Sequence, residues 1–419
     1  MAETGRAIEA VFRIESARLI AGLTRIVRDV GRAEDLAQDA LVAALAVWPE
    51  SGVPDNPGAW LMAAAKNRAL DLVRRDAMLE RKHGELGRER IAEQMRAPAP
   101  EAMDDDVGDD LLRLVFIACH PILATEARVA LALRLLCGLT TEEIARAYLV
   151  PEATIAQRIV RAKRTLAEAR VPFELPRGAD RATRLASVLE VVYLVFNEGY
   201  TATRGADWVR PELCDDALRL ARMLAELMPG EAEAHGLAAL LELQASRLRA
   251  RVGPAGEPIL LLDQDRARWD RLLIGRGLAA LARAGRQGGA LGAYALQAAI
   301  AACHARARTA EETDWQRIAA LYDALAQIAP SPVVALNRAV AVAMAFGPEA
   351  GLPMVDALVA EPSLSGYHLL PSVRGDLLAK LGRFEEARTE FLRAASQSGN
   401  ERERALLLAR AEAASRGVR

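Results

Sequence analysis

Two clusters of polar side chains in this sequence have the chemistry to bind a nucleic acid. The first cluster consists of Lys66, Asn67, Arg68, Arg74 and Arg75. Residues 66–82 contain six basic and three acidic side chains, a net charge of +3. Arginine and lysine hold phosphate groups, and amide side chains pair with base edges. This composition predicts a surface that contacts both the backbone and the bases of DNA.

The second cluster consists of Thr154, Gln157, Arg158, Arg161, Lys163 and Arg164. Residues 151–170 contain five basic and two acidic side chains, again a net charge of +3. An isolated basic helix is more often only a solvated surface. The residues before this cluster favour DNA binding, because they predict a second helix and a short turn.

The elements that position the second cluster form a predicted helix-turn-helix. Thr140 and Glu143 have the spacing of a capping box, so the first helix begins near Thr141. Pro151 favours the start of the next helix near Glu152. On that helix the predicted buried stripe, at spacings of three and four residues, is Ile155, Ile159, Ala162 and Leu166. The polar side chains then lie on the outer faces, as an element entering the major groove requires.

The first cluster lies on a predicted helix that follows a turn of Asn56, Pro57 and Gly58. Trp60 stands near the start of this helix. An exposed tryptophan can stack on an unpaired base, whereas a buried one belongs to the core. Both interpretations of Trp60 are open from the sequence.

Composition restricts the remaining possibilities. The 419 residues are 52% hydrophobic and only 4% aromatic, which favours an all-α fold. The net charge of −2 means that any contact with DNA depends on local basic patches. No apolar core of a signal peptide and no apolar stretch of membrane-spanning length is visible, so we expect a cytoplasmic protein without a membrane span. Neither the four cysteines nor the five histidines have spacing typical of a metal site, a cofactor site or a catalytic site.

We expect three domains. Residues 1–91 read as the first helical domain, and residues 92–110 form an acidic linker with seven acidic and one basic side chain. Residues 111–170 contain the helix-turn-helix, and residues 171–180 form a second linker marked by prolines and a glycine. Residues 181–419 form a larger helical extension.

The two N-terminal domains resemble a known family. Ala33-Glu34-Asp35-Leu36-Ala37-Gln38-Asp39-Ala40, Trp48-Pro49, Ala59-Trp60-Leu61, Asn67-Arg68-Ala69-Leu70-Asp71 and Arg74-Arg75 resemble region two of bacterial RNA polymerase sigma factors. The match is best with the extracytoplasmic-function class. Gly138-Leu139-Thr140-Thr141-Glu142-Glu143-Ile144-Ala145, Thr154-Ile155-Ala156-Gln157-Arg158 and Arg161-Ala162-Lys163 resemble region four of the same class. The order of the motifs, joined by a variable linker, strengthens the resemblance.

The resemblance implies a role for each group of residues. In the family, the acidic helix that matches Glu34, Asp35, Gln38 and Asp39 docks on the clamp helices of the largest subunit of core RNA polymerase, and region four also meets the β-subunit flap. An exposed acidic helix suits a basic protein partner in any case. The segment with Asn56, Trp60 and the first cluster would recognise and open the minus-ten element of promoter DNA. The second cluster would recognise the minus-thirty-five element. Such a protein is not an enzyme, because it supplies promoter specificity to the polymerase.

The extension resembles a tetratricopeptide-like array. Lys380 to Ala387, with Phe391 and Ala394, has the spacing of one such helical hairpin. Two clusters are candidate regulatory loops: Asn197, Glu198, Gly199 and Tyr200 form one, and Asp263, Asp265 and Arg266 belong to the other. The alternative interpretations are a glycine-terminated helix and an acidic helix cap. A sigma subgroup carries a similar extension, so we expect it to regulate activity in cis, with a regulatory protein as a further candidate partner.

Two other functions are compatible with parts of the sequence. A helix-turn-helix transcriptional regulator with a sensory helical domain would account for the second cluster but not for the region-two motifs. A repeat scaffold would account only for the extension.

Overall fold

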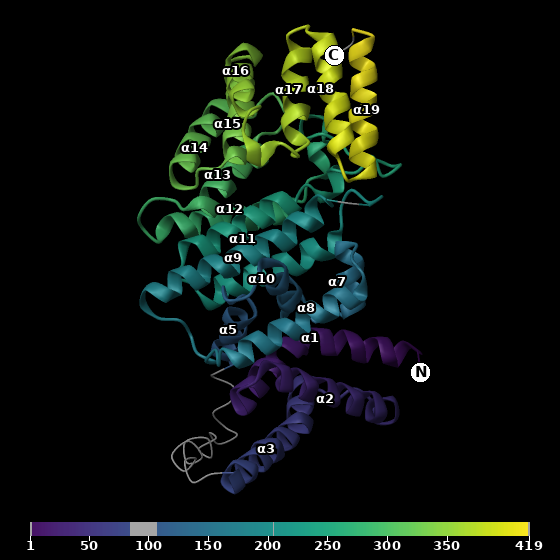
Figure 1. The fold of residues 1–419 in the computed structure, drawn as a ribbon, viewed down its shortest axis with the longest axis vertical. Helices are drawn as coiled ribbons and strands as arrows, with labels where there is room; N and C mark the ends of the chain where they lie inside the picture. The colour runs from purple at the N-terminus through teal and green to yellow at the C-terminus, as the bar shows by residue number, and fades with distance from the viewer. Residues whose placement is uncertain (1, 84–106, 204, 418–419) are drawn as a thin grey trace. The chain divides into compact units, whose positions relative to one another are not determined.

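The protein is all-α, as predicted. The computed structural model describes residues 2–83, 107–203 and 205–417 (Figure 1). Among these residues there is no β-strand, only two isolated β-bridges. None of the helices in the described ranges is both long enough and apolar enough to cross a membrane. The chain forms two compact units, Met1–Val192 and Tyr193–Arg419.

Unit one begins with three helices that pack on one another, α1 (Ala2–Val27), α2 (Val30–Ser51) and α3 (Pro57–His83). Leu23 of α1 is fully buried between them. The Asp29 side chain starts α2 by accepting a hydrogen bond of 2.8 Å from the backbone N–H of Arg32. Asn56 starts α3 in the same way, accepting from the backbone N–H of Ala59 at 3.0 Å. These caps fix where the polar faces of α2 and α3 begin.

Four further helices carry the predicted helix-turn-helix: α5 (Val107–Ala118), α6 (Thr125–Leu136), α7 (Thr141–Tyr148) and α8 (Glu152–Glu168). Helix α5 begins before the predicted end of the acidic linker at residue 110. Asp110 is buried and forms ion pairs with Arg25 at 3.2 Å and Arg113 at 2.6 Å. A carboxylate can be buried when it is paired with cations. Asp110 therefore belongs to a folded contact between α5 and α1. Residues 92–106 of the expected linker lie outside the described residues.

Helix α9 (Gly178–Tyr200) begins in unit one. Arg128 of α6 donates to Ser187 and to Glu190, the latter at 3.0 Å. The Ser187 hydroxyl donates to the carbonyl oxygen of Cys119 at 2.6 Å. The first half of α9 is thus held by α6 and by the end of α5. The division between the two compact units falls after Val192, within α9, whereas the expected extension begins at residue 181.

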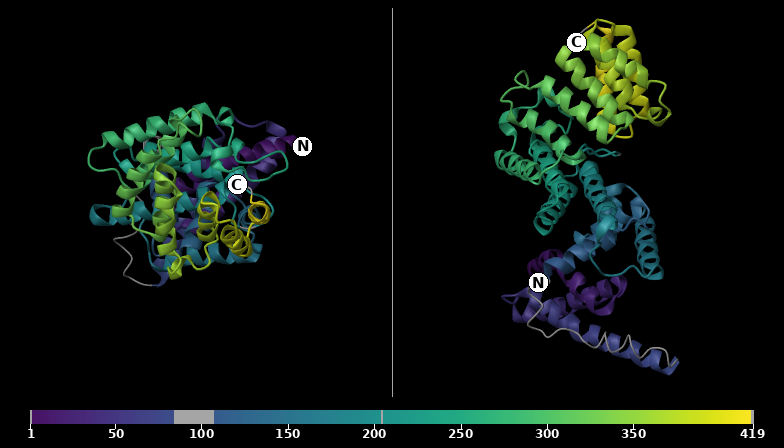
Figure 2. Two further views of the ribbon diagram at one scale, coloured as in Figure 1. Left: turned by 90° about the horizontal axis from the view of Figure 1, so that it is seen from above. Right: turned by 90° about the vertical axis from the view of Figure 1, so that its left-hand side faces the viewer.

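Unit two is a succession of helices in which chain neighbours pack on one another (Figure 2). They are α10 (Pro211–Leu227), α11 (Ala232–Ala245), α12 (Arg271–Arg286), α13 (Ala293–Arg306), α14 (Trp315–Ile328), α15 (Pro332–Phe346), α16 (Pro348–Leu358), α17 (Leu369–Lys380), α18 (Phe384–Gln397) and α19 (Glu401–Ser415). Short 3-10 turns separate some of them, including η3 (Leu261–Asp263) and η4 (Arg266–Arg268). A Cβ on Gly375 would lie 2.9 Å from the Phe391 ring, so glycine permits the close approach of α17 and α18. The assignment to the tetratricopeptide class stays a prediction.

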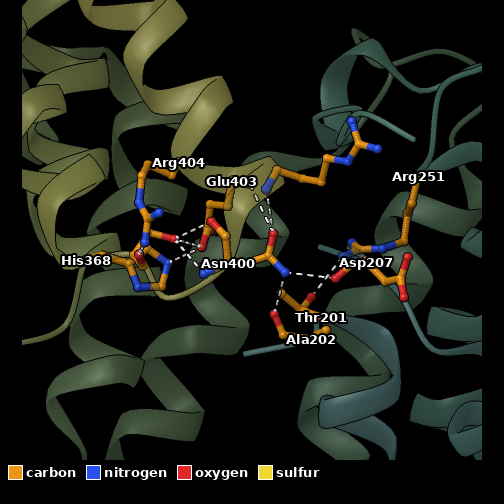
Figure 3. A network of polar contacts seen from close by, with 10 residues as sticks. Thr201, Ala202, Asp207, Arg251, His368, Asn400, Glu403 and Arg404 are labelled. Carbon is orange, nitrogen blue, oxygen red and sulfur yellow. Dashed lines mark hydrogen bonds and ion pairs between the residues drawn. The ribbon is translucent and has the colours of Figure 1, made fainter. Parts of the chain in front are cut away.

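Asn400 joins the loop after α9 to the start of α19 (Figure 3). Its side-chain amide donates to the carbonyl oxygens of Ala202 at 3.1 Å and Asp207 at 2.8 Å. Its side-chain oxygen caps α19 by accepting from the backbone N–H groups of Arg402 and Glu403. Asn400 is only 1% exposed. One buried side chain thereby connects positions about 200 residues apart in the sequence.

Candidate nucleic-acid interface

The helix-turn-helix has the predicted boundaries. The Thr140 side chain accepts from the backbone N–H of Glu143 at 3.1 Å, and the Glu143 side chain accepts from the backbone N–H of Thr140 at 2.8 Å. Helix α7 then begins at Thr141 and α8 at Glu152. Leu149 ends α7 in the left-handed conformation with a φ of 50°. This sharp turn directs α8 away from α7, as a DNA-reading helix requires.

Glu143 also holds the helix-turn-helix to α1. Its carboxylate pairs with Arg13 at 2.6 Å. Partial burial alone would raise the pKa of Glu143, but the hydrogen bonds from the Thr140 backbone and from Arg13 outweigh it and lower the pKa below its usual value. The capping box is therefore charged at neutral pH.

Helix α8 separates its apolar and polar residues as predicted. Ile155, Ile159, Ala162 and Leu166 are buried. Gln157 and Arg161 are exposed, whereas Thr154 and Arg158 are half-buried. Arg164 is exposed and pairs with Glu168 at 2.6 Å, which raises the pKa of its guanidinium. Gln157 and Arg161 are thus the side chains of this cluster that are most accessible to DNA.

The first cluster lies along α3, where Asn67, Arg68, Arg74 and Arg75 are exposed and Lys66 is half-buried. Arg74 pairs with Asp71 at 3.4 Å, and Arg68 pairs with Asp39 of α2 at 3.2 Å. Such exposed ion pairs contribute little to stability and exchange readily for other partners. The outer surface of α3 can therefore offer several cations to a phosphate backbone.

Trp60 agrees in part with each of the two interpretations that the sequence left open, because it is neither fully buried nor fully exposed. Its ring contacts the buried Trp48 edge to face, with centroids 5.2 Å apart and an interplanar angle of 66°. Trp60 itself is half-buried, so part of its surface remains available. Asn56, exposed at the start of α3, uses its side-chain oxygen as the helix cap. Its amide nitrogen remains available to donate to a base.

Glu34 is buried, although we expected it on an exposed acidic face of α2. Its side chain is 4% exposed and pairs with Arg134 of α6 at 2.6 Å and with Lys163 of α8. A buried carboxylate needs such partners, because an unpaired one would lose the free energy of its hydration. Lys163 is half-buried for the same reason and does not belong to the freely accessible basic surface of α8.

The other acidic-helix residues are accessible. Asp35 and Asp39 are exposed and Gln38 is half-buried. Asp35 and Asp39 are four positions apart and share a face of α2 that differs from the face of Glu34, whereas Gln38 lies one turn after Glu34 on the same side. The acidic motif is therefore divided between solvent and interior. The Asp35 side chain has neither a hydrogen bond nor an ion pair to the described part of the chain.

The first candidate regulatory cluster of the extension is part of its fold. Glu198 is almost buried and accepts from Arg210 and from the Thr203 hydroxyl. A Cβ on Gly199 would lie 2.8 Å from the backbone nitrogen of Cys214, so only glycine fits there. Helix α9 continues through Gly199 to Tyr200 instead of ending at the glycine. Asn197 is half-buried in the same helix turn.

The second candidate cluster is also largely structural. Asp263 ends η3, and Asp265 caps η4 by accepting from the backbone N–H of Ala267, as the capping alternative predicted. Arg266 is buried and donates to the carbonyl oxygens of His304 and Ala307 and to the Thr313 hydroxyl. Burial is the main cause that lowers the pKa of the Arg266 guanidinium.

Two arginines that the sequence did not indicate connect these clusters. The Arg251 guanidinium lies 3.7 Å from the centre of the Tyr200 ring. The Arg247 guanidinium lies between Tyr200 and Trp269, at 5.8 Å and 5.6 Å from their centres. These cation–π contacts form an arginine–aromatic stack, by which we mean Tyr200, Arg247, Arg251, Arg266 and Trp269. No local spacing could have revealed it, since its members come from three separate segments.

Within the described ranges, no group of three or more histidine, cysteine, aspartate or glutamate side chains is arranged to hold a metal ion. The four cysteines are buried, and none of them forms a disulfide bond.

Three separate segments of the chain match known family models. Residues 12–78 match the family model of sigma-70 region 2, and residues 113–166 match that of sigma-70 region 4. Residues 184–285 match a family of unknown function, DUF6596. The two sigma segments contain both basic clusters, and the third contains both candidate regulatory clusters.

Two relatives show how far the similarity extends. An uncharacterized protein of Rhizobium meliloti (strain 1021) is 46% identical over 389 residues, which cover 92% of this chain and 90% of the relative. The ECF RNA polymerase sigma factor SigK of Mycobacterium sp. (strain KMS) is 29% identical over 157 residues, 36% of this chain and 77% of that protein. No solved structure matches.

Proposed function

The chain is a sigma factor of the sigma-70 family, and from this premise we propose that it is of the extracytoplasmic-function class and divides promoter recognition between its two basic clusters. Helix α3 and the turn before it would recognise and open the minus-ten element. Helix α8 would read the minus-thirty-five element. Asp35, Gln38 and Asp39 would contact the clamp helices of core RNA polymerase, and region four would contact the β-subunit flap.

The observation that supports this proposal best is the division of faces on α8. Its apolar stripe is buried, and Gln157 and Arg161 are exposed on a helix whose start is fixed by Pro151 and by the turn at Leu149. Amide and guanidinium groups at these positions can pair with base edges in the major groove. A merely structural surface helix would not need the preceding capped helix.

The burial of Glu34 adds a conformational requirement. In the described arrangement of unit one, Arg134 and Lys163 form ion pairs with the Glu34 carboxylate. Glu34 matches a residue of the acidic helix that contacts polymerase in the family. Polymerase can reach Glu34 only after α6 and α8 withdraw from α2. We infer that binding to polymerase separates the region-four helices from the region-two helices.

This separation can be measured with spin labels on Gln38→Cys of α2 and Arg161→Cys of α8. The distance between the labels should increase when core polymerase is added. An unchanged distance in the polymerase complex would contradict the inferred separation. The four native cysteines are buried, which limits their labelling.

We also propose that unit two regulates the sigma factor in cis, with a second protein as a further candidate partner. The support is its size, its covalent attachment through α9, and its inclusion in the match to the Rhizobium relative, which covers 92% of this chain. Comparing the full chain with residues 1–192 in transcription tests this proposal. This truncation keeps Ser187 and Glu190, which hold Arg128. Equal transcription and equal polymerase affinity would argue against regulation.

The proposed function is tested by transcription in vitro with purified core polymerase on a library of genomic fragments. The full chain should produce new, discrete start sites that share two spaced sequence elements. Arg161→Ala should reduce these transcripts, whereas Arg177→Ala, an exposed arginine outside α8, should not. The absence of new start sites would refute the proposal, and tight DNA binding without polymerase would instead indicate a conventional regulator.

A further inference from the structure

Unit two contains a cavity of about 680 Å³ between α10, α11 and α12. This volume lies within the range of roughly 300–1,000 Å³ that is typical of small-molecule sites. All of its lining residues lie within the segment that matches the family of unknown function. The residues assigned to polymerase or promoter binding take no part in it.

The α11 side of the cavity has two hydrogen-bond acceptors without donors. Glu242 is 3% exposed, and one of its carboxylate oxygens accepts from Arg222 at 2.7 Å. Its other oxygen, Oε2, is buried and has no hydrogen-bond partner in the described structure. A buried acceptor in this condition destabilises the folded protein, because it has lost its hydrogen bonds to water. A ligand that supplies a donor would remove this destabilisation.

His235 presents a similar acceptor on the same helix face. It is 5% exposed, and its Nε2 lies 2.9 Å from the carbonyl oxygen of Pro229. Since a carbonyl only accepts, Nε2 carries the proton and Nδ1 is left as an acceptor in the neutral ring. Nδ1 is buried and likewise has no partner among the described residues. His235 and Glu242 are seven positions apart, two helical turns on one face of α11.

On the α12 side of the cavity, hydrogen-bond donors lack acceptors. Arg276 and Arg283, also seven residues apart, line the cavity and are exposed. Neither has an ion pair or side-chain hydrogen bond within the described part of the chain. The residues between them that line the cavity are Ala279 and Ala280, whose small side chains leave the space open. Two guanidinium groups that line the cavity together with these small side chains are suited to bind a carboxylate or a phosphate.

We propose that this cavity binds a small metabolite that carries an anionic group together with hydroxyl or amino donors. The anionic group pairs with Arg276 and Arg283. The donors reach toward Glu242 and His235. An anion alone leaves the two acceptors unsatisfied, and a neutral polyol leaves the two arginines unpaired, so the site selects for both features in one molecule.

The test uses the full chain and four probes: glucuronate, glucose 6-phosphate, glucose and inorganic phosphate. Titration calorimetry and the thermal unfolding midpoint report binding, because a ligand of the folded state raises that midpoint. Glucuronate, glucose 6-phosphate or both should bind, and the comparison of the two distinguishes a carboxylate ligand from a phosphate ligand. Glucose and inorganic phosphate should bind at least about tenfold more weakly than the better of these two probes.

Variants locate the binding. The double variant Arg276→Gln and Arg283→Gln should weaken binding at least about tenfold. The matched double variant Arg271→Gln and Arg286→Gln removes two exposed charges of α12 that do not line the cavity, and should leave binding unchanged. Circular dichroism checks that both proteins are folded.

Three results would overturn the proposal. The first is no binding of any probe. The second is equal binding of inorganic phosphate and glucose 6-phosphate together with no binding of glucuronate, which would indicate an adventitious ion only. The third is equal loss of affinity in both double variants, which would indicate a general effect of charge.

Discussion

The polar motifs of the two units have opposite surroundings. In unit one, Asp35, Asn67 and Arg161 face solvent. In unit two, Tyr200 and Arg266 are enclosed in the arginine–aromatic stack, where Arg266 alone satisfies three acceptors. A polar motif in solvent is available to a partner, whereas a buried one that binds other parts of the same chain holds the fold together. Similar clusters of charged and aromatic residues in a sequence can therefore serve binding in one region and folding in another.

The largest effect is expected for Arg266→Ala. The substitution leaves the carbonyl oxygens of His304 and Ala307 buried without a donor, so it should destabilise unit two by about 3 kcal/mol. Chemical denaturation measures this loss. Arg268→Ala, an exposed neighbour in η4, is the control and should change stability by less than about 0.5 kcal/mol. If Arg266→Ala lowered the free energy of unfolding by less than about 1 kcal/mol, the buried polar motif of unit two would not hold the fold together, and the contrast with unit one would fail.

Asn400→Ala should destabilise unit two by about 2 kcal/mol. It removes two donors to buried carbonyl oxygens and the cap of α19. Hydrogen exchange should then increase at the start of α19 and in the loop that contains Ala202. Exchange that increases only at α19 would show that Asn400 acts as a cap and not as a connection.

For Arg161→Ala we expect weaker promoter binding and unchanged stability. Promoter binding by the polymerase complex should weaken by about 1–3 kcal/mol if Arg161 contacts a base edge. Stability should stay within about 0.5 kcal/mol of the parent protein, because Arg161 is exposed. Footprinting and thermal unfolding measure the two quantities. A stability loss without a binding loss would place Arg161 with the structural motifs.

The smallest effect concerns the pH dependence of the capping box. The pKa of Glu143 is lowered in the folded protein, so its stabilisation is fully present above the usual pKa of 4.5 and is lost as the pH falls through the lowered value. Glu143→Gln should therefore cost about 1 kcal/mol at pH 7 and less at pH 3. Denaturation at both pH values tests this. An equal cost at both would mean that the charge of Glu143 is irrelevant.

Local features were predictable from the sequence, and long-range pairings were not. Thr140 and Glu143 fixed the start of α7, and the spacing of Ile155, Ile159 and the residues after them gave the buried face of α8, because both depend on neighbours within one or two turns. Glu34 looked like the other acidic residues of its helix. Its burial depends on Arg134, 100 positions away.

The same limit applies to the extension. The donors of Asn400 bind carbonyl oxygens 198 and 193 positions away, and no local pattern indicates them. The cavity beside Glu242 likewise arises only when α10, α11 and α12 pack together. A helical pattern predicts the existence of each helix but not which of its polar residues another helix will cover.

The most direct test of the account is the affinity of the full chain for core polymerase, measured for the parent protein, for Asp35→Ala and for Glu174→Ala. Asp35 and Glu174 are both exposed acidic residues, but only Asp35 belongs to the acidic face of α2. We predict that Asp35→Ala raises the Kd about tenfold, which corresponds to about 1.4 kcal/mol, with unchanged unfolding, and that Glu174→Ala changes neither. An unchanged Kd for Asp35→Ala, or an equal increase for both variants, would contradict the claim that the solvent-facing motifs of unit one serve the polymerase.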